Sequence, residues 1–231
     1  MRSTFLFCVL IFAFFSGFSQ KYNQYDAEGK RHGKWKKKYE NTDHIRYEGT
    51  FDHGKEIGEF KFYKPSSDGS PTAIKVFSKN NDTILVKYFT KKGKIISEGG
   101  MIGKDRIGLW KYYHNDSKKI MMTEEYQSGK LHGEQLTYFD NGQLTENNSY
   151  IEGKREGKRI MYSEDGIKIK EFTYENDQLH GITKYFDTKK GELIIEGNYK
   201  RDRKDGIWNY YENGKLSEQK LFPLQQGAND N

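Results

Sequence analysis

The sequence predicts an all-β protein, an elongated single antiparallel sheet of about eight stacked β-hairpin repeats that is twisted or curled and solenoid-like. Two observations predict it: glycines recur at a fixed spacing, and each period holds two short runs rich in aromatic and β-branched residues. The marker glycines are separated by 24 or 25 residues, with one gap of 50: Gly33, Gly58, Gly108, Gly133, Gly157, Gly181 and Gly206. Spacing of this kind is typical of a repeat array.

Residues 1–19 are expected to be a secretory signal peptide outside the fold. A short basic start precedes an apolar run from Phe5 to Phe15, and small residues then suit cleavage after Ser19. The run is shorter than the ~20 residues of a membrane span, so an uncleaved anchor is the alternative interpretation. The only cysteine, Cys8, lies in this run. The sequence thus predicts export to the periplasm, cell surface or medium, with no transmembrane span after cleavage.

Residues 20–222 are expected to form the repeat array, with two strands in each unit. The first strand carries the marker glycine, and an aromatic residue follows five positions later: Tyr63, Tyr113, Tyr138, Tyr162, Phe186 and Tyr211. Turn signals such as Asn141-Gly142 favour two-residue hairpin turns. The second strand carries a recurrent glutamate: Glu48, Glu98, Glu124, Glu146, Glu171, Glu196 and Glu218. The glycines interrupt any window long enough for an amphipathic helix.

The gap of 50 residues predicts one degenerate unit in the middle of the array. Thr83 stands where a marker glycine is due, and Tyr88 follows five residues later. Residues 64–84 depart furthest from the repeat, so an irregular or bulged section is expected there. At the other end, residues 223–231 are short and largely polar, and they are expected to be a disordered tail.

The repeat resembles that of the MORN (membrane occupation and recognition nexus) family, in its longer-period bacterial variant. Tyr47-Glu48-Gly49-Thr50-Phe51 with Gly54, and Glu196-Gly197-Asn198-Tyr199, carry one part of the likeness. Gly33-Lys34-Trp35 and Gly206-Ile207-Trp208 carry the other. The resemblance implies an elongated sheet of stacked hairpins used for interaction or scaffolding, sometimes near membranes. Some bacterial members with this variant are labelled antitoxin-like.

The charge of the chain favours acidic partners. Its formal net charge is +6, with both signs interspersed. Such a chain is attracted weakly to lipid headgroups, acidic glycans or acidic proteins. Nucleic acid fits the charge but not the expected export. The partner class predicted from the sequence is therefore a protein, a cell-surface glycan or another acidic surface.

One repeat position holds a large ring in four units: Trp35, Phe60, Trp110 and Trp208. Core packing is the first interpretation, but Gln135, Arg159 and Thr183 hold the same position in three consecutive units, which suggests a solvent-facing strip there. Exposed rings would suit sugar stacking or peptide docking. With Lys36 and Lys37 of the basic first unit, the four rings form the candidate binding surface. A solvated terminal repeat is the alternative interpretation of that first unit.

Neither the histidines nor the glutamates predict a catalytic or metal centre. Histidines one period apart would lie several strands apart, too far for one coordination sphere. The recurrent glutamates could form a carboxylate pair for glycoside cleavage, but repetition favours pairing with cross-strand lysines or turn amides. No phosphate loop, nucleophile elbow or metalloprotease motif is present. No cofactor is expected.

The sequence therefore predicts an exported binding or scaffold module for a protein or cell-envelope partner, with no catalysis expected. Two alternatives stay open. One is an antitoxin or immunity-like protein that neutralises a toxin. The other is an enzyme acting on envelope glycans, which would depend on Glu146 or Glu171.

Overall fold

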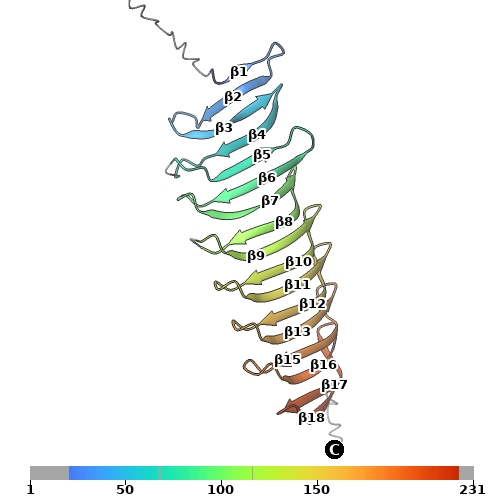
Figure 1. Cartoon of the computed structure of the whole chain (residues 1–231). Coiled ribbons are helices and arrows are strands. Elements are labelled where there is room, and N and C mark those ends of the chain that lie inside the picture. Colours follow the sequence, from blue (N-terminus) through green and yellow to red (C-terminus); the bar gives the residue numbers. More distant parts are fainter. Residues whose placement is uncertain (1–20, 68, 116, 224–231) are drawn as a thin grey trace, which may run out of the picture.

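The computed structural model describes residues 21–67, 69–115 and 117–223. Within these residues the chain forms 18 antiparallel β-strands in a single open sheet, without helices. The hairpins stack along one axis in chain order from β1 to β18 (Figure 1). The predicted fold class is confirmed. The predicted signal peptide lies outside the described residues, as does the predicted tail apart from Pro223.

Each strand pairs with the next one along the chain, except that β14 and β15 both pair with β13. The first half of the array contains β1 (Gln24–Tyr25), β2 (Arg31–Lys38), β3 (Ile45–Asp52), β4 (Lys55–Phe62), β5 (Ala73–Phe77), β6 (Thr83–Phe89), β7 (Ile95–Ile102), β8 (Asp105–Tyr113) and β9 (Ile120–Gln127). The second half contains β10 (Lys130–Tyr138), β11 (Leu144–Ile151), β12 (Lys154–Tyr162), β13 (Lys168–Glu175), β14 (Gln178–Leu179), β15 (Gly181–Phe186), β16 (Leu193–Lys200), β17 (Arg203–Glu212) and β18 (Lys215–Phe222).

The marker glycines lie where the ladder between successive units is offset. Between β7 and β8, Gly100 pairs with Ile107 and Glu98 with Lys111, so β8 advances four residues while β7 advances two. Gly108 lies inside this β-bulge with φ of 60°, a conformation that costs glycine little and other residues more. The other six marker glycines also have positive φ: Gly33, Gly58, Gly133, Gly157, Gly181 and Gly206. The bulge explains why the period requires glycine.

One face of the sheet, the core face, buries the row of large rings. Trp35, Phe60, Trp110 and Trp208 are 7%, 1%, 0% and 1% exposed. Three of these rings lie directly on a glycine of the preceding strand, because a Cβ on Gly49, Gly99 or Gly197 would lie within 2.4 Å of Phe60, Trp110 or Trp208. The glycine of the Tyr/Glu-Gly signal therefore marks the place where a ring packs directly against the backbone of the preceding strand.

Charged side chains cover three of these rings in the single-layer sheet, whereas Phe60 is packed against Phe51, Phe62 and Phe77. The Arg106 guanidinium carbon lies 4.4 Å from the centre of the Trp110 ring, and Lys204 Nζ lies 4.0 Å from that of Trp208. Arg31 covers Trp35 and Phe51 in the same way. Cation–π contact and the aliphatic stems of these side chains take the place of a second layer.

The degenerate unit is present, but its register is one residue away from the prediction. Val86, 1% exposed, holds the core-face position. Ile84 pairs with Met101, as the marker glycine Gly108 pairs with Tyr126, so Ile84 and not Thr83 replaces the glycine. The cause lies between β4 and β5, because Gly58 and its partner Phe77 are 19 residues apart, whereas Gly108 and its partner Tyr126 are 18 apart. Longer connections, residues 63–72 and 78–82, flank β5 in this section.

Candidate functional site

The four predicted ring residues are core residues, so their proposed docking role is set aside. A partner could not contact rings that are at most 7% exposed. The expectation of a solvent-facing strip in units five to seven is also wrong, since Thr183 is fully buried and Gln135 and Arg159 are half-buried. Size matching explains the change of residue type at position 183: by the register of β13 with β15, Thr183 lies beside Phe172, whereas Trp110 lies beside Gly99.

Lys36 and Lys37 lie on opposite faces of β2. Lys36 is half-buried, and its Nζ lies 3.2 Å from Oε2 of Glu48 on β3. Lys37 is exposed, next to the buried Trp35. The two lysines therefore do not form one surface with the rings, and a docking role for them remains a prediction.

The recurrent glutamates belong to two faces rather than to one row. Glu48, Glu98, Glu171 and Glu196 lie on the face opposite the rings, here called the open face, and each pairs with a cross-strand lysine. Glu124 and Glu146 lie on the core face. Pairing with lysine, one of the expected tasks, is thus present for the open-face set. Glu146 and Glu171 lie on opposite faces and do not form a carboxylate pair.

Tyrosine hydroxyls complete three of the four open-face pairs. Tyr113 donates to Glu98 at 2.5 Å, and Lys87 lies 2.9 Å from the same carboxylate. The hydrogen bond from Tyr113 is the main cause that holds the pKa of Glu98 below its usual value, and the hydrogen bond from Lys87 is the next. Partial burial and the bond to Glu98 raise the pKa of Tyr113 to about 12. The same arrangement joins Tyr63 to Glu48 and Tyr211 to Glu196.

The core-face carboxylates belong to a buried polar network. Glu124 is 7% exposed and accepts hydrogen bonds from Tyr112, Tyr126 and Gln135. Glu146 accepts from Asn148 and is held by Arg159 at 3.0 Å. Both carboxylates accept hydrogen bonds from protein donors, which indicates a structural role.

The open face exposes large apolar side chains. The exposed apolar residues of β5 to β17 all fall on it by strand alternation: Val76, Leu85, Ile96, Ile102, Leu109, Met121, Ile151, Ile182, Ile194 and Ile207. Leu85 and Leu109 are 58% and 49% exposed. Sequence reasoning centred on the rings missed these residues, although each of Leu109, Ile182 and Ile207 stands beside a core-row residue and alternation alone assigns it to the other face.

Two adjoining hollows on the open face form a groove across β6, β7 and β8. The first, about 340 Å³, has Leu85 and Leu109 as walls and Gly99-Gly100 as a floor. The second, about 640 Å³, is lined by Phe89, Ile95 and Tyr113. Lys87 and Glu98 line both hollows, so the two lie side by side. We call this feature the Leu85–Leu109 groove.

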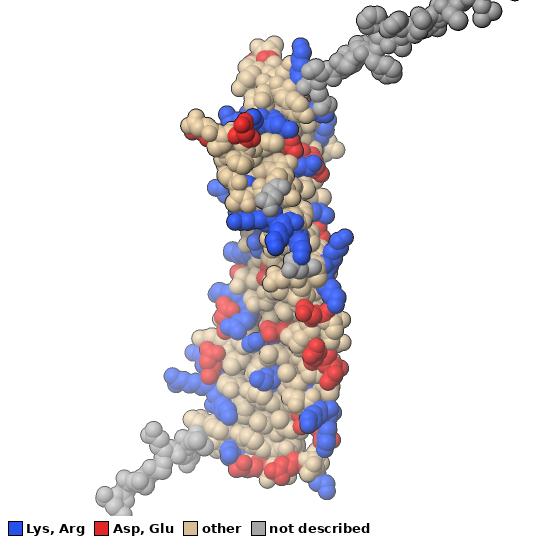
Figure 2. All heavy atoms as spheres, turned by 90° about the vertical axis from the view of Figure 1, so that its left-hand side faces the viewer, with Lys and Arg blue, Asp and Glu red and all other residues tan. Residues whose placement is uncertain are grey.

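The rim of the groove is basic. Lys87, Lys94, Lys111 and Lys118 line it, against the single carboxylate of Glu98. The neighbouring loops add the exposed Lys91, Lys92 and Lys119. Figure 2, which faces the left-hand side of Figure 1, shows Lys and Arg side chains gathered near the middle of that side of the molecule. The groove therefore favours ligands that combine apolar groups with negative charge.

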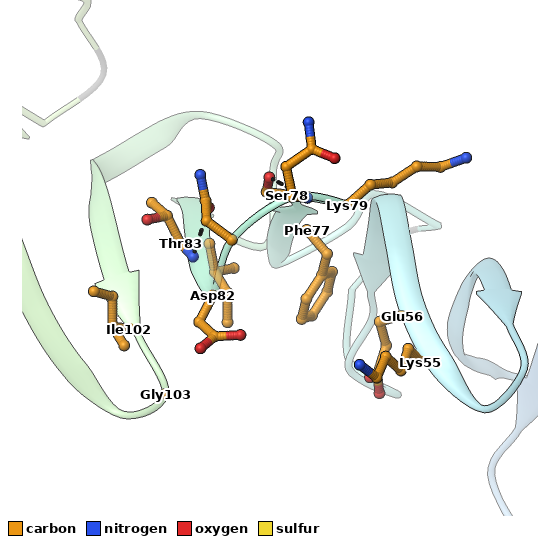
Figure 3. Close-up of a pocket in the computed structure, with 12 residues that line it drawn as sticks. Lys55, Glu56, Phe77, Ser78, Lys79, Asp82, Thr83, Ile102 and Gly103 are labelled. Atoms are coloured by element: carbon orange, nitrogen blue, oxygen red, sulfur yellow. Dashed lines mark hydrogen bonds between the residues drawn. The ribbon is translucent and has the colours of Figure 1, made fainter.

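A further hollow of about 640 Å³ opens at the break in the repeat, at the opposite sheet edge. Phe77 and Ile102 line it together with the connection 78–82, and the carboxyl groups of Glu56 and Asp82 lie around it (Figure 3). Lys55 and Lys79 balance these two carboxylates. With its charges balanced, this hollow favours ligands of one charge less strongly than the groove does.

The described residues contain one group suited to a metal ion, formed by Asp26, His32 and His53. The spacing argument holds for histidines at one repeat position, such as His32 and His132. It does not cover His53, which lies in the turn between β3 and β4 and contacts His32.

The part of the chain that the structure describes has no helix of the length and apolar character needed to cross a bilayer. A scan against protein-family models finds no match for the chain, and a search of curated proteins finds no similar sequence. Fold and groove together define a repeat protein of stacked β-hairpins with one face packed and one face open.

Proposed function

We propose that this protein is a binding module, exported to the cell envelope or beyond, that takes up an extended protein segment in the Leu85–Leu109 groove. The segment would present apolar side chains to the two hollows and acidic side chains to the lysines of the rim. The observation that carries the proposal is the exposure of Leu85 and Leu109 over a floor of two glycines. Exposed apolar patches rimmed by polar residues are typical of interaction sites.

The shape of the groove supports a chain-like ligand. It runs across three strands and is open along its length, whereas small-molecule sites usually enclose most of their ligand. Gly100, whose missing side chain would point to the open face, leaves room there for an inserted side chain, as in modes of recognition where pockets take alternate residues of an extended peptide. Four lysines against one glutamate set the preference for acidic flanks.

Site-specific photocrosslinking in cells tests the proposal. A photoreactive amino acid at position 109 should trap a discrete partner, identified by mass spectrometry, and one at position 134 should not. Glu134 is the matched control, because it holds the same repeat position on the same face one unit further on.

Charge reversal tests whether the adduct depends on the lysines of the groove or only on the exposure of position 109. Lys87→Glu with Lys111→Glu should abolish the adduct formed from position 109. Lys158→Glu, at an open-face lysine outside the groove, should leave it intact. Equal adducts at positions 109 and 134, or an adduct that survives the double reversal, would contradict the proposal.

A further inference from the structure

The N-terminal end of the array brings together a carboxylate and two imidazoles from three separate segments. Asp26 lies in the turn before β2, His32 on β2, and His53 in the turn between β3 and β4. One potential ligand atom from each lies within 4.8 Å of the others. The two imidazole rings lie 4.8 Å apart, and Asp26 Oδ2 lies 2.7 Å from His53 Nδ1.

Backbone contacts hold this group in place. Asp26 Oδ1 accepts hydrogen bonds from the backbone N–H groups of Glu28 and Lys30, which leaves Oδ2 directed at His53. The Asp26 side chain is only 9% exposed. The backbone N–H of Gly54 donates to the carbonyl of Arg31, which ties the turn holding His53 to the strand holding His32.

We propose that Asp26, His32 and His53 bind a divalent transition metal such as Zn²⁺. Imidazole nitrogen and carboxylate oxygen are ligands that this ion prefers, and three protein ligands leave a coordination position for water. Asp52 Oδ1 lies 3.7 Å from His32 Nδ1 and 3.9 Å from His53 Nε2, too far for a hydrogen bond but close enough to add negative charge beside a bound cation.

The metal would fasten the end of the ladder. Strand β1 has only two residues and pairs with β2 alone, while Asp26 follows it directly. A metal bridge from Asp26 to the β3–β4 turn would join the terminal turn to the first hairpin. Terminal repeats lack a neighbour on one side, and such a cap stabilises them.

Two other histidines provide internal controls. His132 lies 3.8 Å from Glu152, and His180 lies 3.3 Å from Glu175. Each is a histidine before a marker glycine, as His32 is, but among the described residues neither belongs to a group of three ligands. A site made by the terminal geometry should therefore be absent from these units.

Titration of the purified full chain, without a histidine tag, tests the proposal with Zn²⁺ by calorimetry and with Co²⁺ by visible absorption. One equivalent of Zn²⁺ should bind. His32→Ala and His53→Ala should each weaken binding at least tenfold, while His132→Ala should leave it unchanged. Circular dichroism should show the same β-sheet signal in all variants.

A thermal melt provides the second measurement. Saturating Zn²⁺ should raise the melting temperature of the wild-type chain and of His132→Ala, but not that of His53→Ala. Absence of binding at micromolar Zn²⁺ would overturn the proposal and leave an Asp26–His53 ion pair alone. Equal loss of binding on His132→Ala would overturn it as well.

Discussion

Substitution of Gly99 by alanine should destabilise the array strongly, because Trp110 occupies the space that the new methyl group needs. An added Cβ would lie 2.4 Å from Cδ2 of the indole and 2.5 Å from two further ring atoms. The ring is fully buried, and its Nε1 donates to the carbonyl of Gly100 at 2.9 Å. Arg106 covers its other side.

The magnitude follows from two contributions. Overpacking of a filled site costs about 1–3 kcal/mol, and displacement of the ring would also lose the indole hydrogen bond, worth about 1 kcal/mol. Gly99→Ala should therefore lower the free energy of unfolding by about 2–4 kcal/mol. Urea unfolding followed by circular dichroism measures this value.

Gly100→Ala is the matched control. Its Cβ would point to the open face, 3.2 Å from Cγ1 and 3.3 Å from the backbone oxygen of Ile107, so a shift of only a few tenths of an ångström is needed. This neighbour substitution should change the free energy of unfolding by less than about 1 kcal/mol.

Repeating Gly99→Ala in a Trp110→Val variant tests the contact between residue 99 and the indole ring directly. With Trp110→Val, which reproduces the valine of the degenerate unit at position 86, Gly99→Ala should become neutral or stabilise by up to about 1 kcal/mol, since alanine restricts the unfolded chain. The coupling between the two substitutions should thus be about 2–4 kcal/mol. Equal costs for Gly99→Ala and Gly100→Ala, or additive effects with Trp110→Val, would refute the packing argument.

Three further predictions concern the polar ladders. Because the folded pKa of Glu98 is lowered, its contribution to stability is present above the unfolded pKa of ~4.3 and is lost as pH falls through the folded value; Glu98→Gln should flatten this part of the melting temperature against pH. In alkaline titration followed by phenolate absorbance, one class of tyrosine should ionise near pH 12, the value for Tyr113, and Glu98→Gln should lower it part of the way toward ~10. Asn148→Ala should cost about 1–3 kcal/mol in urea unfolding, because Asn148 is 4% exposed and donates to Glu146; a cost below ~0.5 kcal/mol would contradict its role.

The repeat could be predicted from the sequence because its physical causes are local. A glycine at position 108 is required by its own backbone angle, and the ring at Trp110 follows two residues later in the same strand. Strand alternation then assigns Leu109 to the other face. These relations need no knowledge of the partner strand.

The misassigned features depend on the partner strand instead. The register of the degenerate unit depends on how β4 pairs with β5, and the sequence does not reveal that the connection 63–72 adds one residue there. The spacing of the glutamates places Glu124 in one row with Glu98, but the pairing of its strand is shifted by one residue. Glu124 therefore lies on the core face. The contact of His32 with His53 depends on a turn that only one unit supplies with histidine.

Carbene footprinting of the purified protein and of the protein in intact cells tests the central claim most directly, since it measures the exposure of both faces at once. The account predicts that Trp110 and Trp208 are protected in both samples, whereas Leu85 and Leu109 are labelled in the purified protein and protected in cells. Strong labelling of the two tryptophans in the purified protein, or equal labelling of Leu85 and Leu109 in both samples, would contradict the account.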